Sequence, residues 1–107
     1  MNEFIKIEFR TSENQDNLCK LLISHFPYFE WRKGDSDMQG LYISGMNNES
    51  VQIQLWLEKN SEAMTISFRS LSGEKDEREK FKHKIYNNVK DNIFPSFTKI
   101  VKIKENA

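Results

Sequence analysis

Three side chains carry the sulfur or imidazole groups that most often bind transition metals or act as nucleophiles and bases: Cys19, His25 and His83. Cys19 and His25 stand six residues apart in one predicted helix, about 120° apart around its axis, so they cannot close on one ion. His25 falls in the last turn of that helix, where an imidazole can serve the free carbonyl groups. We expect His83, which has lysines on both sides, to lie in solvent. These residues therefore predict no metal site and no cofactor.

Two aspartates in one short segment, Asp35 and Asp37, raise the question of calcium. An EF-hand loop has acidic ligands at positions 1 and 3, a glycine at position 6 and a bidentate glutamate at position 12. Gly40 stands at the sixth position counted from Asp35, but Met46 stands at the twelfth. The flanking residues also predict strands and not helices. We therefore expect an ordinary turn in this segment, formed by aspartate, serine and glycine.

Catalytic motifs of other kinds are also missing from the sequence. The chain lacks the Gly-x-Ser-x-Gly pattern of serine hydrolases, and its four glycines stand apart instead of forming a phosphate-binding loop. We therefore do not expect an enzyme.

The segment from Lys80 to Lys104 contains seven lysines, Lys82 among them, and one acid, Asp91. Lysines interleaved with aromatic rings are one pattern of nucleic-acid-binding surfaces. A helix dipole explains part of this pattern equally well, because it favours acids at the start of a helix and bases towards its end. Lysine also lacks the fork with which arginine binds phosphate. Nucleic-acid binding by the C-terminal helix and strand is therefore the alternative function.

Alternating apolar and polar residues predict six strands, and apolar residues three or four apart predict two helices. A capping-box spacing from Ser12 to Gln15 begins the first helix, and prolines end both helices. The strands are expected at 4–10, 28–32, 41–43, 51–58, 64–69 and 97–104, and the helices at 12–26 and 74–94. The order β-α-β-β-β-β-α-β predicts an α+β fold: a two-layer sandwich whose mostly antiparallel sheet of five to six strands has both helices on one face. We expect a single domain over residues 1–107.

The clearest alternation lies in residues 51–58, which we expect to pair with 64–69 as a hairpin. Ile53 and Leu55 then face the helices, as do Ile66 and Phe68, and Trp56 stands on the opposite face among glutamines. A tryptophan exposed in this way is typical of protein-contact surfaces. The predicted partner-binding residues are Trp31, Asp35, Asp37, Glu49, Gln52, Gln54, Trp56 and Glu58.

Charge is unevenly distributed along a chain whose formal net charge is zero. Residues 12–62 contain eight acids and four bases, whereas residues 63–107 contain six acids and ten bases. The acidic balance of the first segment suggests that its surface attracts a basic partner.

These features favour a small non-catalytic protein-binding domain. Its most concrete form is an immunity or antidote protein that neutralises a basic, nuclease-like toxin through an acidic, aromatic sheet surface. The sequence shows no apolar run of membrane-spanning length and no signal-peptide pattern at its start. The expected location is therefore the cytoplasm, and frequent Asn, Ile and Lys suggest a bacterial source. The sequence leaves the oligomeric state open.

Overall fold

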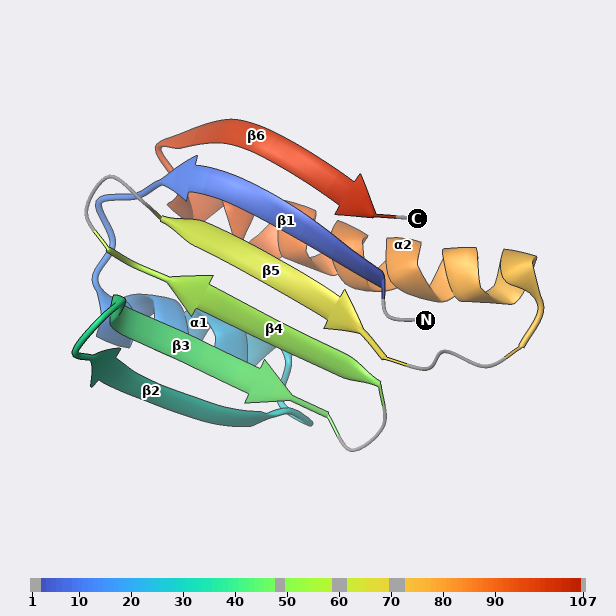
Figure 1. Cartoon of the computed structure of the whole chain (residues 1–107), viewed down its shortest axis with the longest axis horizontal. Helices are drawn as coiled ribbons and strands as arrows, with labels where there is room; N and C mark the ends of the chain where they lie inside the picture. The colour runs from blue at the N-terminus through green and yellow to red at the C-terminus, as the bar shows by residue number, and fades with distance from the viewer. Residues whose placement is uncertain (1–2, 48–49, 59–61, 70–72, 107) are drawn as a thin grey trace.

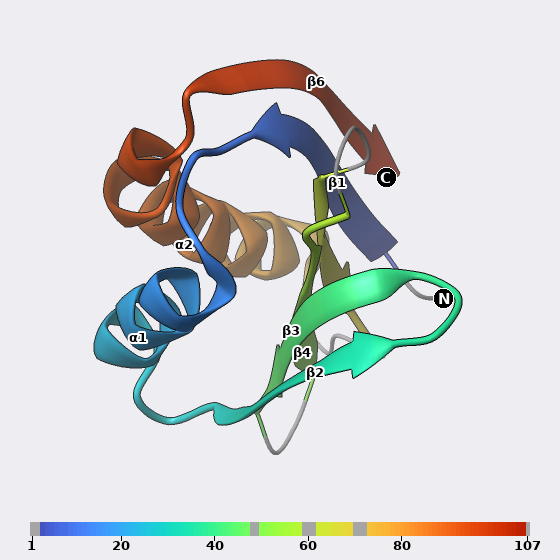
Figure 2. The same cartoon turned by 90° about the vertical axis from the view of Figure 1, so that its left-hand side faces the viewer.

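The computed structural model, which describes residues 3–47, 50–58, 62–69 and 73–106, has two layers. Figures 1 and 2 show one six-stranded antiparallel sheet with both helices on the same face. The elements are β1 (Glu3–Arg10), α1 (Gln15–His25), β2 (Glu30–Ser36), β3 (Gly40–Met46), β4 (Val51–Trp56), β5 (Ala63–Phe68), α2 (Lys75–Asn92), the 3-10 helix η1 (Phe94–Ser96) and β6 (Lys99–Asn106). The predicted α+β class, element order and two-layer arrangement are confirmed.

The strands follow the order β2-β3-β4-β5-β1-β6 across the sheet. Four consecutive strands, β2 to β5, form a meander, and β1 lies between β5 and β6. The first and last strands of the chain are therefore neighbours (Figure 1). This long-range pairing decides which charges meet at one margin of the sheet.

The core lies between the sheet and the two helices, as the alternation in the sequence predicts. Ile53 and Leu55 of β4 are fully buried, and so are Ile66 and Phe68 of β5. Leu18 and Leu22 of α1 and Val89 of α2 close the core from the helix layer. The predicted facing of the β4–β5 hairpin is therefore confirmed.

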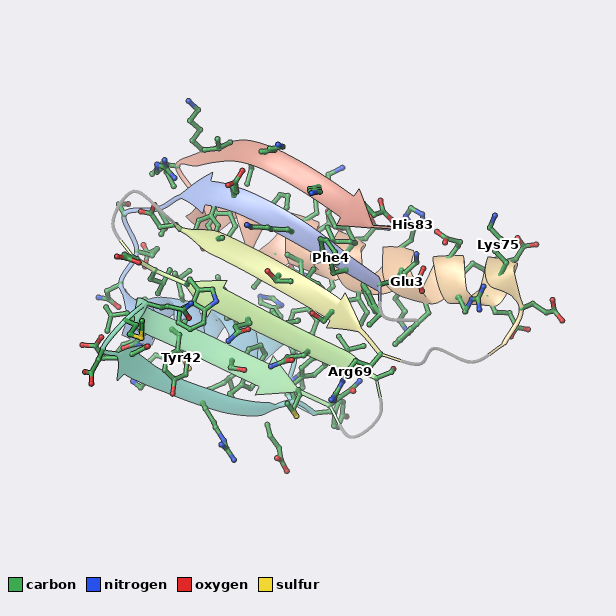
Figure 3. The ribbon with its side chains drawn as sticks, viewed as in Figure 1. Glu3, Phe4, Tyr42, Arg69, Lys75 and His83 are labelled. Atoms are coloured by element: carbon green, nitrogen blue, oxygen red, sulfur yellow. The ribbon has the colours of Figure 1, made fainter. Side chains whose placement is uncertain are left out.

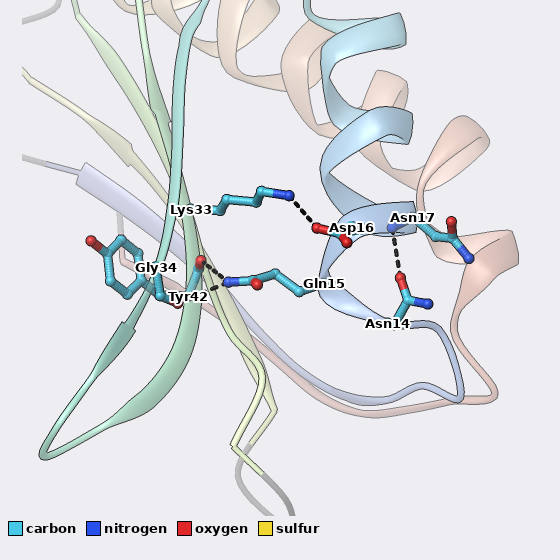
Figure 4. Close-up of polar contacts among 7 residues, drawn as sticks. All are labelled: Asn14, Gln15, Asp16, Asn17, Lys33, Gly34 and Tyr42. Atoms are coloured by element: carbon cyan, nitrogen blue, oxygen red, sulfur yellow. Dashed lines mark hydrogen bonds and ion pairs between the residues drawn. The ribbon is translucent and has the colours of Figure 1, made fainter.

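Helix α1 begins two residues later than the capping-box spacing predicts. Its N-cap is Asn14, whose side-chain oxygen accepts a hydrogen bond from the backbone N–H of Asn17 at 2.8 Å (Figure 4). Asparagine is as good an N-cap as serine, so the sequence holds two competing start signals. Thr11 holds the chain before the helix, since its hydroxyl donates to the carbonyl of Ser96 at 2.8 Å.

Strands β2 and β3 are longer than predicted, and each contains a glycine, Gly34 in β2 and Gly45 in β3. The ring of Tyr42 lies over Gly34, where a Cβ would come within 2.7 Å of the Tyr42 hydroxyl oxygen. Likewise the ring of Trp31 lies over Gly45, where a Cβ would overlap it. The turn itself spans only residues 37–39 and ends at Gly40, whose φ is 80°. The glycines at 34 and 45 thus make room for aromatic rings instead of bending the chain.

We expect Gly45→Ala to lower the free energy of unfolding by about 1–3 kcal/mol, as overpacking does. The added methyl group must displace the Trp31 ring, whose Nε1 donates to the carbonyl of Phe26 at 3.0 Å. Urea denaturation measures the loss. Trp31 fluorescence, recorded in a Trp56→Phe background, should shift to longer wavelength. Ser44→Ala on the opposite face is the control and should change the free energy by less than about 0.5 kcal/mol. An unchanged Trp31 spectrum in Gly45→Ala would contradict this packing.

The last strand, β6, pairs with β1 in an irregular register. A register shift between Glu8 and Phe9 pairs Phe9 with Ile100 and Ile7 with Ile103. Ile100 and Ile103 therefore lie on the helix side of the sheet, and Val101 is 47% exposed.

One lysine of α2 is buried and does not belong to a lysine-rich surface. Lys82 is 2% exposed, and its Nζ lies 2.9 Å from a carboxylate oxygen of Glu3 and 3.0 Å from one of Glu79. Burial favours the neutral amine, but the hydrogen bonds and charges of Glu3 and Glu79 outweigh it and raise the pKa of Lys82. Lys82 thus joins the start of β1 to α2.

Candidate binding surface

The open face, as we call the side of the sheet opposite α1 and α2, faces the viewer in Figure 1. Strand register shows which residues lie across it. One row contains Ser44, Gln54, Thr65, Lys6 and Lys104 in successive strands. Parallel to this row run Tyr42, Trp56, Ala63, Glu8 and Lys102 on one side, and Met46, Gln52, Ser67 and Phe4 on the other.

The middle of the open face carries no charge over three adjacent strands. Its side chains are small or amide groups, and all are half-buried: Ser44, Gln52, Gln54, Ala63, Thr65 and Ser67. The side-chain nitrogen of Gln52 lies 3.3 Å from the hydroxyl oxygen of Ser44, to which it donates. Within β3, β4 and β5 the open face therefore carries no charged side chain, and charge begins at the ends of these strands and on the strands on either side.

An aromatic pair, Tyr42 and Trp56, stands next to this uncharged centre. The two residues are cross-strand partners, and their ring centroids lie 5.6 Å apart with the planes inclined at 51°. Both side chains are half-buried. Figure 3 labels Tyr42 on β3, and Gly34 provides the space beneath its ring. Trp56 thus rests on one neighbouring ring and remains partly open to a partner.

On the helix side of the sheet, α1 is hydrogen-bonded to β2 and to β3, the strand that carries Tyr42. The side-chain nitrogen of Gln15 donates to the carbonyls of Gly34 and Tyr42, at 2.8 and 2.9 Å (Figure 4). Nearby, Lys33 of β2 forms an exposed ion pair with Asp16 of α1. Its hydrogen bond and charge hold the pKa of the Asp16 carboxyl below its usual value. The first turn of α1 therefore fixes the position of the β2–β3 hairpin.

A hollow of about 470 Å³ lies on the open face beside Trp56. Its lining residues come from three strands, from the turn between β2 and β3 and from the segment after β4: Phe4, Lys6, Gln39, Trp56, Glu58, Ala63, Thr65 and Ser67. The members from β5, Ala63, Thr65 and Ser67, are short and leave this space between the larger side chains on β4 and β1. The hollow is shallow and open, which suits a protruding group of a binding partner.

The predicted partner-binding residues are only partly brought together. Gln52, Gln54 and Trp56 share the open face, and the exposed Glu58 lines the hollow. Asp37 is exposed in the turn between β2 and β3. Glu49 lies outside the described residues.

Trp31 and Asp35 lie on the other side of the sheet. In β2 they alternate with Glu30 and Arg32, and they pair with Gly45 and Leu41 on the helix side of β3. The Trp31 ring stacks on Phe29 with centroids 5.7 Å apart and packs against the core. The expectation that Trp31 and Asp35 border Trp56 is therefore wrong. Trp31 is a packing residue.

Two residues of the open face were not predicted, Tyr42 and Phe4. Tyr42 is the cross-strand partner of Trp56, and Phe4 lines the hollow. Their position follows from the alternation around them, because Tyr42 precedes the buried Ile43 and Phe4 precedes the buried Ile5. The alternation alone does not show that they lie near Trp56, because that depends on the register between strands.

Charge on the open face also differs from the expectation. Its strands present the acids Glu8 and Glu30 and the bases Lys6, Arg10, Arg32, Lys99, Lys102 and Lys104, and the acid Glu58 lines the hollow. The face is therefore not acidic. Much of the negative charge of residues 12–62 lies elsewhere, since Glu13 and Asp16 are at the start of α1 and Asp35 faces the helix side.

The lysines of the C-terminal segment do not form one surface. Lys80, Lys84 and Lys90 are exposed on α2, in the helix layer, whereas Lys102 and Lys104 project from the open face. The helix lysines and the strand lysines therefore do not share one face of the sheet. Only the strand lysines join the open face.

A search against models of known protein families and against curated proteins finds no match to the sequence. Among the described residues, no helix is long and apolar enough to cross a membrane.

Proposed function

We propose that this protein is a non-catalytic binding domain that takes a protein partner on its open face, with Trp56 and Tyr42 as the anchor. The observation that carries the proposal is an aromatic pair beside a centre without charges, with charged residues only at the margins. Protein interfaces have the same organisation: charge is depleted in their middle, tryptophan and tyrosine are enriched, and the rim is polar.

The rigidity of the surface supports the same function. A partner that binds a preformed face loses less conformational entropy than one that must order it. The open face belongs to a sheet whose other side is packed against the core, and Gln15 fastens the edge hairpin to α1. An inhibitor that acts by occupying its target needs this property and needs no cofactor.

The concrete form of the proposal is an immunity or antidote protein that neutralises a basic, nuclease-like toxin in the bacterial cytoplasm. Two acids support a basic partner: Glu58 lines the hollow beside Trp56, and Asp37 is exposed in the turn between β2 and β3. Asp35 lies on the helix side of the sheet, so it can attract a basic partner only through long-range electrostatics and does not contact it on the open face.

The test begins by capturing the partner on the tagged protein and measuring binding by surface plasmon resonance. Trp56→Ala should raise the dissociation rate by roughly 30-fold, about 2 kcal/mol, as the loss of an interface anchor does. Salt should change this effect little, because the lost contact is apolar. Lys84→Gln on α2 is the control and should leave both rates unchanged. Binding of the same protein with wild-type rates by Trp56→Ala would overturn the proposal.

A further inference from the structure

We propose that the margin of the open face formed by β1 and β6 binds the phosphate backbone of single-stranded nucleic acid. This basic strip consists of Lys6, Arg10, Lys99, Lys102 and Lys104. It goes beyond protein binding at Trp56, because β5, β1 and β6 follow β4 in the sheet and place the β6 lysines about 14 Å from the anchor strand.

Like charges lie directly opposite each other in the strip. Lys6 is the cross-strand partner of Lys104, and Arg10 is the partner of Lys99. Opposed like charges destabilise a sheet, whereas unlike pairs stabilise it. The fold does not explain two such pairs on the same two strands, and a bound polyanion would remove their repulsion.

Few acids compensate these charges. Between the two like-charged pairs lies Glu8, opposite Lys102, and Arg10 is 3.3 Å from a carboxylate oxygen of Glu62. Among the described residues, no ion pair involves Lys6, Lys99, Lys102 or Lys104. All four of these lysines are exposed. Their ammonium groups are therefore available to an external anion.

The spacing of the lysines suits a chain of phosphates better than a single anion. Residues two apart on one face of a strand are about 6.7 Å apart, and neighbouring strands are about 4.8 Å apart. Lys102 and Lys104 therefore form a line along β6, with Lys6 beside Lys104 on β1. A flexible backbone with one charge per residue can follow this line.

An aromatic ring next to the strip favours a single strand over a duplex. Phe4 precedes Lys6 by two residues, lies on the same face and lines the hollow (Figure 3). The short side chains of Thr65 and Ser67 leave space beside the ring. An unpaired base attached to a phosphate at Lys6 can stack on Phe4. A paired base must first be unpaired and unstacked from its duplex, which costs free energy. An acidic polypeptide would use the lysines but not the ring.

The experiment measures fluorescence anisotropy of a labelled 12-nucleotide oligo(dT) titrated with the full chain at several salt concentrations. Binding should weaken with salt, with a slope of log K against log salt of roughly −0.7 for each phosphate contacted. Lys6→Gln combined with Lys104→Gln should weaken binding at least tenfold at low salt and make the slope about 1.4 shallower. Phe4→Ala should weaken binding without changing the slope, because stacking releases no ions.

The matched control is Lys84→Gln combined with Lys90→Gln, which removes the same charge from α2. It should retain oligo(dT) binding within about twofold if the contacts are local to the strip. A loss equal to that of the strip variant would show that net charge alone attracts DNA and would overturn the proposal. Three other results would also overturn the proposal. They are binding that does not depend on salt, binding of a DNA duplex of the same length as tightly as the single strand, and displacement of oligo(dT) by an equal charge of polyglutamate.

The two proposed surfaces fail separately. Trp56→Ala should lose the protein partner but retain oligo(dT) binding. Lys99→Gln combined with Lys104→Gln, at strip positions that do not line the hollow, should weaken oligo(dT) binding but keep the protein partner. If Trp56-dependent capture of a protein succeeds and oligo(dT) does not bind, the nucleic-acid proposal alone is wrong. If oligo(dT) binds through the strip and no protein is held through Trp56, the protein-binding proposal alone is wrong.

Discussion

Leu55→Ala is expected to lower the free energy of unfolding by about 2–5 kcal/mol. Leu55 is fully buried near the end of β4, between cross-strand partners Ile43 and Met64 that are fully buried as well. Truncation removes apolar contacts and leaves a cavity that a regular sheet cannot easily close. Urea denaturation at neutral pH, followed by circular dichroism, measures the change.

The adjacent residue provides the control for this prediction. Gln54 lies on the open face and is half-buried, so Gln54→Ala should change the free energy of unfolding by less than about 0.5 kcal/mol. The contrast between two neighbouring substitutions tests the facing of β4 independently of any function. Equal stabilities for the two variants would contradict it.

Alternation predicted the facing of β4 correctly because one side of that strand contacts only the core. Val51, Ile53 and Leu55 are fully buried, while the residues between them are polar or aromatic. Strand β2 is different, since it is an edge strand and charged side chains lie on both of its faces. Lys33 and Asp35 on the helix side are exposed, so their polarity gave no sign that Trp31 faces the core.

The composition of the open face depends on pairings that no local pattern contains. Lys6 and Lys104 come from opposite ends of the chain and become neighbours only because β6 returns beside β1. A sum of charge over a segment of sequence mixes both faces of each strand with the helices. The sum over residues 12–62 therefore predicted an acidic surface. In the structure, the sheet places Asp35 and Trp56 on opposite faces and brings the lysines of β1 and β6 onto the face that carries Trp56.

Lys82 is the residue whose substitution should show most clearly how a charge is held in the core of this domain. Lys82→Ala should lower the free energy of unfolding by about 2–4 kcal/mol, because it removes a buried aliphatic stem and both ion pairs. Lys82→Met keeps most of the stem and should recover more than half of that loss. The remaining carboxylates of Glu3 and Glu79 can be hydrated, since their side chains are 19% and 39% exposed.

The difference between wild type and Lys82→Met should also depend on pH, in a direction fixed by the ion pairs. The hydrogen bond and charge of Lys82 hold the pKa of Glu79 below its ordinary value of 4.5. The stabilisation from this shift is complete above that value and is lost as pH falls through the pKa of the folded state. The raised pKa of Lys82 stabilises the fold up to alkaline pH, and this stabilisation is lost only above the ordinary pKa of 10.5. The free energy of unfolding of wild type should therefore exceed that of Lys82→Met most between these two pH limits. Urea denaturation at about pH 7 and about pH 3 should show that this difference is smaller in acid. A methionine variant as unstable as the alanine variant at neutral pH would show that the ion pairs, and not the packing of the stem, account for most of the effect.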